Sequence, residues 1–228
     1  MFKQIKKVLV IAPHPDDETL GVGGTIKKLS KNKIDVSILV VGGHLPPIYK
    51  AEDYMQTEKE CKKACNILGS KKIFFLKKVA TKFNEEAIAD FNKSLINIIN
   101  KVDPELVFIP FPDRHIDHKV VFNSCMVCTR PNKKSGLKMV LAYETLSETH
   151  WNAGYIEPNF IPDVFIDISD EYKFKEKALK NYSSQIKNNK ARNIEAVKGL
   201  ATFRGSQNNT KYCEAFKLIR LNFWFDFV

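Results

Sequence analysis

The sequence predicts an α/β fold, in which a Rossmann-like, mostly parallel sheet is flanked by helices. Apolar runs of strand length recur along the chain and alternate, in its earlier part, with segments of helical periodicity. At 228 residues, the chain is long enough to bury one sizeable core, and α/β domains of this length commonly remain undivided. We therefore expect residues 1–228 to form a single domain, with a helical elaboration toward the C-terminus.

The predicted strands are the six apolar runs at residues 8–11, 36–41, 73–76, 106–109, 139–142 and 164–168. Helices that connect parallel strands by right-handed crossovers are expected at residues 20–31, 52–68 and 85–100. Helix-like sequence then covers residues 171–189 and 191–203. The final apolar stretch, at residues 216–228, is expected to complete the core; a subunit interface in a homo-oligomer is the alternative.

A histidine and three acidic residues directly follow the first predicted strand, in the segment Ala12-Pro13-His14-Pro15-Asp16-Asp17-Glu18. The two prolines make the chain leave the strand in a stiff, extended conformation, which brings the acidic side chains to the carboxyl edge of the sheet. Ligands of open α/β sheets bind at that edge. The position and the chemistry of this segment therefore both indicate a metal site.

A second segment with the same kinds of side chain follows the predicted strand at residues 106–109, and its sequence is Asp113-Arg114-His115-Ile116-Asp117-His118. Prolines again end the strand, at Pro110 and Pro112. Three of the five histidines of the chain lie in these two short segments, although the segments are far apart in the sequence. A shared site is the economical interpretation.

Catalytic zinc sites take three protein ligands and leave one position for water, and both imidazole and carboxylate are acceptable ligands. His14, Asp17 and His118 would supply such a set. Taken singly, the acidic residues could cap the following helix, and a lone histidine after a strand is usually a loop residue. Two strand-end clusters of metal-ligand residues are hard to explain by capping, so we favour a shared metal site. His44 and His150 are interpreted as loop histidines.

The remaining polar residues of the two segments have the chemistry of proton transfer. Asp16 could take a proton from the water that the metal activates. His115 could stabilise the oxyanion or protonate the leaving amine. Asp117, which lies between the two histidines of its segment, could orient one of the rings through a hydrogen bond.

The glycines of Gly21-Val22-Gly23-Gly24 lack the GxGxxG spacing of a dinucleotide-binding loop, and the acidic motif occupies the turn where a pyrophosphate would lie. We therefore expect no nucleotide cofactor. The small residues instead predict a first helix that packs closely on the sheet. The longest irregular segments, at residues 42–53, 131–138 and 147–162, are expected to border the site.

The chain carries a net charge of +10, from 36 basic and 26 acidic residues. The lysines occur singly or in pairs and arginine is scarce, so nucleic-acid binding is not expected. A basic surface could still favour an anionic substrate, such as a nucleotide-linked sugar. No apolar stretch is long enough for membrane insertion and the N-terminal segment does not resemble a signal peptide, so we expect a cytoplasmic protein. The five cysteines, an odd number, indicate reduced thiols.

The segment APHPDDE after the first strand and HIDH after the fourth resemble the two signature motifs of the PIG-L/LmbE-like family of metal-dependent de-N-acetylases. The likeness extends over most of the chain, through residues 60–69, 165–169, 177–179, 182–185, 204–205 and 214–216. One feature differs. Many relatives have an arginine near the start of the second helix that contacts sugar hydroxyls, where this chain has Thr57-Glu58-Lys59.

The resemblance implies three zinc ligands, which are His14, Asp17 and His118, and another divalent metal such as Fe²⁺ is the alternative ion. It also implies that Asp16 is the general base and that His115 with Asp117 handles the oxyanion and the leaving group. Family members typically remove acetyl groups from N-acetylglucosamine-type sugars that are free, nucleotide-linked, lipid-linked or joined to another aglycone. The implied activity is zinc-dependent de-N-acetylation of such a sugar, and the late segments look more like relatives in glycan or surface-polysaccharide assembly.

Two other functions stay open. The same metal site could hydrolyse a non-sugar N-acyl substrate, such as an acylated thiol conjugate or an amino-acid derivative. A carbohydrate-binding protein without catalysis is the second alternative, and the missing arginine motivates it. The complete set of catalytic residues argues against this second alternative.

Overall fold

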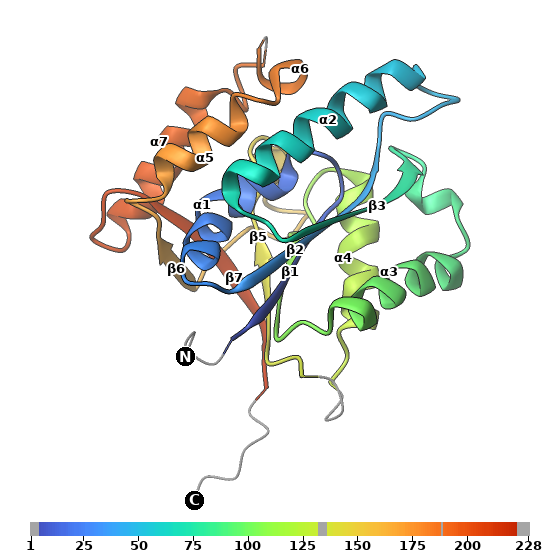
Figure 1. Ribbon diagram of the computed structural model, residues 1–228, viewed down its shortest axis with the longest axis horizontal. Helices are drawn as coiled ribbons and strands as arrows, with labels where there is room; N and C mark the ends of the chain where they lie inside the picture. The colour runs from blue at the N-terminus through green and yellow to red at the C-terminus, as the bar shows by residue number, and fades with distance from the viewer. Residues whose placement is uncertain (1–4, 132–135, 188, 223–228) are drawn as a thin grey trace, which may run out of the picture.

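The computed structural model describes residues 5–131, 136–187 and 189–222, and its seven strands form one sheet in the order β3-β2-β1-β4-β5-β7-β6 (Figure 1). The strands are β1 (Lys7–Ala12), β2 (Asp35–Gly43), β3 (Lys72–Val79), β4 (Leu106–Pro110), β5 (Met139–Tyr143), β6 (Val164–Asp167) and β7 (Cys213–Leu221). β1 to β5 run parallel to one another, whereas β7 is antiparallel to both of its neighbours. The predicted mostly parallel α/β sheet is therefore confirmed.

The helices are α1 (Asp17–Lys31), α2 (Ala51–Leu68), α3 (Ile88–Val102), α4 (Ile116–Cys128), α5 (Tyr172–Leu179), α6 (Ser183–Ile186) and α7 (Ile194–Ser206). Two short 3₁₀ helices, η2 (Phe83–Glu85) and η3 (Thr149–Trp151), lie in loops. Figure 1 shows α1, α2 and α5 on one face of the sheet and α3 and α4 on the other. None of the described helices has the length and apolar character needed to cross a membrane.

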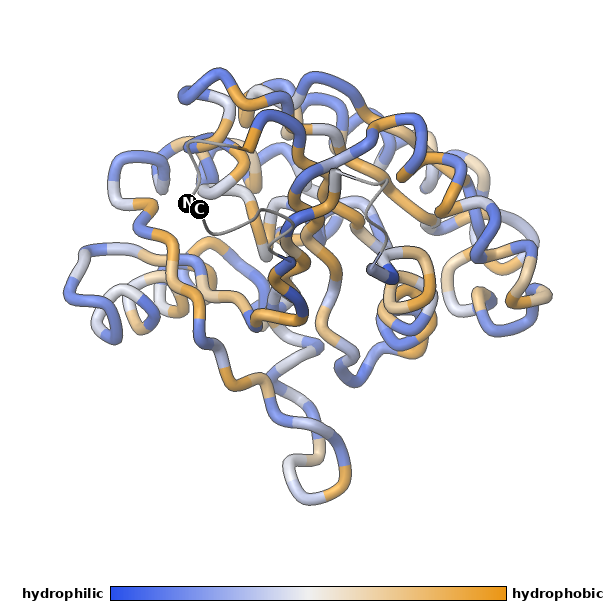
Figure 2. Tube along the Cα trace, turned by 90° about the horizontal axis from the view of Figure 1, so that it is seen from below, coloured by the Kyte–Doolittle hydropathy of each residue, from blue (hydrophilic) through white to orange (hydrophobic). Residues whose placement is uncertain are grey.

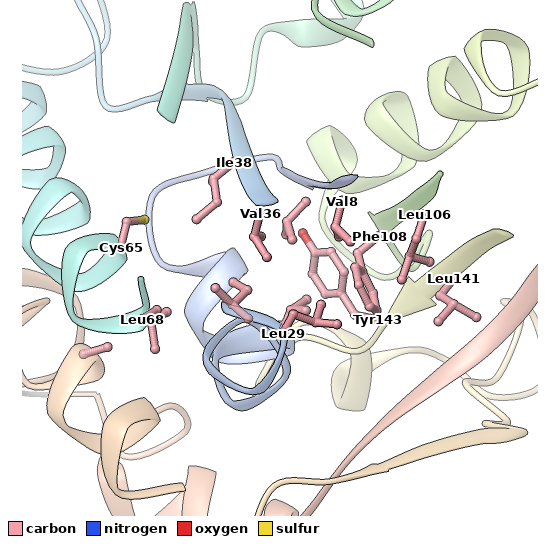
Figure 3. Close-up of a cluster of buried hydrophobic side chains, with 14 of the residues drawn as sticks. Val8, Leu29, Val36, Ile38, Cys65, Leu68, Leu106, Phe108, Leu141 and Tyr143 are labelled. Atoms are coloured by element: carbon pink, nitrogen blue, oxygen red, sulfur yellow. The ribbon is translucent and has the colours of Figure 1, made fainter. Parts of the chain in front are cut away.

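Strand β1 divides its side chains between the two faces of the sheet. Val8 and Val10 pack with side chains of α1 and α2, whereas Leu9 and Ile11 pack with side chains of α3 and α4. Figure 3 shows part of the first of these cores, where strand side chains face α1 and α2. Because both faces are buried, the central strands have continuous apolar sequences, which is why the sequence predicts them well; Figure 2 colours the chain by hydropathy.

Strands β1 and β4 are hydrogen-bonded neighbours, with Val8 opposite Leu106 and Val10 opposite Phe108. The chain places β2 and β3 on one side of β1 and returns to place β4 and β5 on the other. The strand order therefore changes direction between β1 and β4. Ligands of open α/β sheets bind at the carboxyl ends of the strands at such a switch point, and the two predicted metal-ligand segments follow these two strands.

The C-terminal part of the chain departs from the predicted helices. Residues 171–189 form α5 and the short α6 because the chain turns at Tyr182, whose buried hydroxyl donates a hydrogen bond to Glu18. The first part of the apolar stretch predicted at residues 216–228 belongs to β7, which completes the core between β5 and β6. The end of that stretch, residues 223–228, lies outside the described residues.

The irregular segment at residues 131–138 does not border the predicted site. Residue 138 directly precedes β5, and its backbone N–H donates a hydrogen bond to the carbonyl oxygen of Glu105, just before β4. The described part of the segment therefore lies at the amino ends of these strands, on the edge opposite the site. The prediction is wrong there, and residues 132–135 lie outside the described residues.

Helix α1 packs closely on the sheet through its glycines, as predicted. A Cβ atom on Gly21 would lie 2.2 Å from Cδ2 of Tyr143, and one on Gly24 would lie 2.6 Å from Cδ1 of Ile168. The Tyr143 hydroxyl donates a hydrogen bond of 2.9 Å to the carbonyl oxygen of Ile11, so the ring is held against β1. This close packing positions the N-terminus of α1 at the carboxyl end of β1.

We expect Gly21→Ala to lower the free energy of unfolding by about 1–3 kcal/mol, because the added methyl group overlaps the Tyr143 ring. Gly199→Ala, in α7, is the matched control. Outside the neighbouring residues and the backbone of its own helix, no described atom lies within 4 Å of the Cβ there, so this change should raise the free energy of unfolding by about 0.5–1 kcal/mol. Urea unfolding followed by circular dichroism measures both values, and equal effects would contradict the close packing of α1.

Candidate functional site

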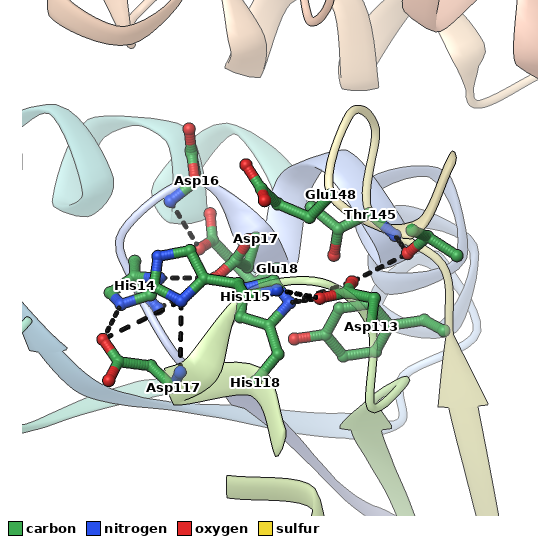
Figure 4. Close-up of polar contacts among 12 residues, drawn as sticks. His14, Asp16, Asp17, Glu18, Asp113, His115, Asp117, His118, Thr145 and Glu148 are labelled. Carbon is green, nitrogen blue, oxygen red and sulfur yellow. Dashed lines mark hydrogen bonds and ion pairs between the residues drawn. The ribbon is translucent and has the colours of Figure 1, made fainter. Parts of the chain in front are cut away.

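Two loop-to-helix junctions bring the predicted site residues together at the carboxyl edge of the sheet (Figure 4). His14 lies between β1 and α1, Asp17 begins α1, and Asp16 is the N-cap of that helix. His115 is the N-cap of α4, and His118 lies in the first turn. Asp16 has a φ of 112°, a conformation that residues with a Cβ rarely adopt and that is typical of functional sites.

The Asp17 carboxylate joins the two segments. Its Oδ2 atom lies 3.4 Å from Nδ1 of His14 and 3.4 Å from Nε2 of His118. The same oxygen accepts a hydrogen bond of 2.9 Å from the backbone N–H of His14. Ligand atoms held about 2.1 Å from a tetrahedral zinc ion lie roughly 3.4 Å apart. Both distances from Asp17 therefore match the spacing of zinc ligands.

A second carboxylate contacts each of these histidines at the ring nitrogen that faces away from Asp17. Nε2 of His14 lies 2.8 Å from Oδ2 of Asp117, and Nδ1 of His118 lies 3.0 Å from the carboxylate of Asp113. An ionised carboxylate only accepts hydrogen bonds, so these ring nitrogens carry the hydrogen. In the neutral rings, the lone pairs are then on the two nitrogens that face Asp17. Metal-binding histidines are typically oriented in this way.

His115 faces the same space but is oriented differently. Its Nδ1 atom accepts a hydrogen bond of 3.1 Å from the backbone N–H of Asp117, so the hydrogen of the neutral ring is on Nε2. Burial and the neighbouring His14 and His118 lower the pKa of His115 to about 4. His115 is therefore a neutral ring that can donate a hydrogen bond from Nε2.

The buried carboxylates give the cluster a high affinity for positive charge. Burial lowers the pKa of His14, but its hydrogen bonds to Asp117 and Asp17 raise it more, to about 9. The pKa of His118 is raised well above its usual value, because Asp17 and Asp113 outweigh burial. The rings of His14 and His118 therefore each bind a second proton and carry a positive charge. A divalent cation would supply the same charge, so the electrostatics of the cluster also favour a metal.

A cavity of about 270 Å³ lies beside the histidines. It is lined by the first motif (His14, Pro15, Asp16, Asp17), the end of β2 and the loop after it (Gly43, His44, Tyr49), Thr57 of α2, the loop after β3 (Ala80, Thr81), the second motif (His115, His118), the loop after β5 (Glu148) and the segment from α6 to α7 (Gln185, Asn189, Arg192). Two of the three irregular segments predicted to border the site, residues 42–53 and 147–162, therefore do so.

Asp16 lines this cavity and is paired with an arginine. Burial and the charge of Asp17 raise the pKa of Asp16 to about 8, and Arg192 opposes that shift. Nη1 of Arg192 lies 3.5 Å from Oδ2 of Asp16. Figure 4 shows Asp16 and Glu148 on one side of the histidines and Asp117 on the other. Asp16 thus faces the cavity, whereas Asp117 supports His14 from behind.

Several cavity residues carry no local sequence signal. Arg192 stands at the start of a predicted helix, where an arginine has many ordinary roles. His44 is a loop residue as interpreted, yet its ring lines the cavity, 4.4 Å from the ring of Tyr49 between centroids. Helix α2, where the sequence has Thr57-Glu58-Lys59, offers Thr57 to the cavity, while Arg192 supplies a guanidinium from the C-terminal part of the chain. Only the tertiary fold identifies these residues.

Two sets of donor atoms in this cluster could hold a metal. One is the predicted set of His14, Asp17 and His118. The other contains His115 in place of Asp17, since ligand atoms of the three histidines lie within 4.8 Å of one another. The two sets share His14 and His118 and differ only in the third ligand.

A comparison with family models gives one match that contains both motifs. The model described as PIG-L: GlcNAc-PI de-N-acetylase matches residues 9–129, which is more than half of the chain. This range extends from β1 to the residue after α4 and includes every predicted site residue.

Relatives with assigned activities are also similar to the chain. It is 28% identical over 243 residues to the diacetylchitobiose deacetylase of Thermococcus kodakarensis, covering 96% of this chain and 85% of the relative. It is 28% identical over 127 residues to a probable N-acetyl-alpha-D-glucosaminyl L-malate deacetylase 2 of Bacillus anthracis, covering 51% and 56%. The solved structure of N,N'-diacetylchitobiose deacetylase from Pyrococcus horikoshii matches with a TM-score of 0.76 and 26% identity, covering 96% of this chain and 85% of that one.

Proposed function

The chain belongs to the PIG-L family of de-N-acetylases, and on this premise we propose that it removes the N-acetyl group of an N-acetylglucosamine-type amino sugar by metal-dependent hydrolysis. The amide C–N bond breaks, acetate is released and the sugar keeps a free amine. One observation carries the proposal: the Asp17 carboxylate lies 3.4 Å from two imidazoles at a cavity that Asp16 also lines. The named activities of the relatives support the same reaction.

We assign the metal to His14, Asp17 and His118, with zinc as the ion. The distances of 3.4 Å from Asp17 to both rings and the carboxylates that accept hydrogen bonds from His14 and His118 support this set. His115 is the weaker third ligand because a backbone N–H already occupies its Nδ1 atom. When bound, a zinc ion would polarise the acetamide carbonyl and lower the pKa of a water molecule.

The residues around the assigned ligands transfer the proton and stabilise the charge that develops during hydrolysis. Asp16, on the cavity wall, is the base: its ionised form accepts a proton from the attacking water, and that proton returns to the leaving amine. His115 donates a hydrogen bond from Nε2 to the carbonyl oxygen as negative charge develops there. Asp117 supports both steps, because its carboxylate orients His14 and its backbone N–H orients His115.

We expect Asp16→Asn to lower the turnover number about 10²- to 10⁴-fold while zinc affinity stays close to that of the wild type. An amide cannot accept the proton, and Asp16 is not an assigned ligand. Acetate release from a panel of N-acetylated amino sugars and the zinc content of the purified protein measure the two effects. Asp90→Asn, an exposed position on α3, is the control for the loss of one carboxylate. A fully active Asp16→Asn variant would exclude Asp16 as the base.

We expect Asp113→Asn and Asp117→Asn each to weaken zinc binding about 10- to 100-fold, because each removes the charged partner of a ligand histidine. Competition with a chromogenic chelator measures the affinity. Asp163→Asn is the control, since Asp163 pairs with Lys217 at the surface, away from the cavity. Unchanged affinity in both site variants would contradict the assigned orientation of His14 and His118.

A further inference from the structure

Arg192 and Glu148 form an ion pair on the cavity wall that the hydrolytic steps do not use. Nη2 of Arg192 lies 2.9 Å from Oε1 of Glu148 and 3.3 Å from Oγ of Ser147. The other terminal nitrogen, Nη1, lies 3.5 Å from Asp16. The side chains of Arg192 and Glu148 are only 18% and 15% exposed, so solvent screens the pair weakly. The Glu148 carboxylate therefore already compensates the guanidinium of Arg192, and a second carboxyl group, that of Asp16, lies beside it.

Beyond the assigned metal site, the described lining of the cavity has no unpaired lysine or arginine for an anionic substrate group. Arg192 is the only lysine or arginine among its described lining residues, against three carboxyl groups, those of Asp16, Asp17 and Glu148. The other side chains that could contact a sugar beyond the metal are neutral donors and acceptors, such as Tyr49, Thr57, Gln185 and Asn189. Hydroxyl and amide groups of this kind are suited to hydrogen bonds with sugar hydroxyls.

We propose that the Arg192–Glu148 pair selects uncharged amino sugars and excludes sugars that carry a phosphate or a carboxylate beside the acetamido ring. This inference rests on the proposed de-N-acetylation and names its substrate class. A phosphate entering this wall meets Glu148 as well as Arg192, and the repulsion from Glu148 offsets the attraction to Arg192. The hydroxyl groups of a neutral saccharide can donate hydrogen bonds to Glu148 and accept them from Arg192.

The net charge of the chain does not favour an anionic substrate at this site. The +10 charge comes from a large excess of lysine, and lysine is absent from the described cavity lining. The basic surface can raise the concentration of anions near the protein, but selection depends on the groups that contact the bound substrate. The relatives are named for both kinds of substrate, a neutral chitobiose derivative and a malate conjugate, so the family alone does not decide the class.

The test compares two substrates that share the acetamido ring and differ in the substituent at the anomeric carbon, which is neutral in one and anionic in the other: the methyl α-glycoside of N-acetylglucosamine and N-acetyl-α-glucosamine 1-phosphate. For the zinc-loaded wild type, we expect kcat/KM for acetate release to favour the glycoside at least about tenfold. Calorimetry with the same two ligands gives the ratio of dissociation constants without turnover, and it should favour the glycoside as well. A wild type that binds and hydrolyses the phosphate as well as the glycoside would overturn the inference.

The decisive variant is Glu148→Gln, which removes one carboxylate from Arg192 without changing the size of the side chain. We expect it to shift the ratio of the two substrates about tenfold toward the phosphate, in both turnover and binding. A general loss of stability would affect both substrates equally and leave the ratio unchanged. Glu157→Gln is the matched control on the same loop, since Glu157 pairs with Lys119 and Arg114 and is not a lining residue.

The outcomes separate this inference from the proposed function. If Glu148→Gln leaves both ratios at the wild-type value, or shifts them no more than Glu157→Gln does, the pair does not select for charge and the inference is wrong. If no N-acetylated sugar releases acetate, the proposed function fails. The ratio of dissociation constants then still decides whether the cavity discriminates against the anion.

Discussion

The Asp17 carboxylate is the interaction on which the site depends, because it links two segments that the chain supplies from separate parts of the sequence. It begins α1, it accepts a hydrogen bond from the backbone of His14, and it faces the rings of His14 and His118 at equal distances. This arrangement requires α1 to start directly at the carboxyl end of β1. The close approach of Gly21 to Tyr143 holds the helix there. Packing of the core thus determines where the ligands lie.

The strands and the two motifs could be predicted from the sequence because their signals are local. Strands buried on both faces have continuous apolar runs, and His14 and His118 lie in acidic segments just after such runs. That β1 and β4 are neighbours is not a local property, although the shared chemistry of the two segments pointed to it. Arg192 and Tyr182 show where prediction fails. Arg192 reaches the cavity only because the C-terminal part of the chain folds over it. Tyr182 interrupts a helical pattern because its hydroxyl donates a hydrogen bond to the buried Glu18, which is distant in the sequence.

The residues that line the cavity come from two parts of the chain. The wall around His115 comes from the strand ends of the first half of the chain, within the range that matches the family model. The wall around Glu148 and Arg192 comes from the loop after β5 and the segment before α7, beyond that range. The groups proposed to be catalytic thus lie at the sheet edge, and the Arg192–Glu148 pair proposed to select the substrate lies on later segments.

The identity of the third metal ligand tests this account most directly. A crystal structure of the zinc-loaded protein, with the ion located by anomalous scattering, would show it. We expect zinc bound by Nδ1 of His14, Nε2 of His118 and a carboxylate oxygen of Asp17, with His115 outside bonding distance and facing the cavity. Zinc bound by all three histidines, with Asp17 displaced, would contradict the central role given to the Asp17 carboxylate.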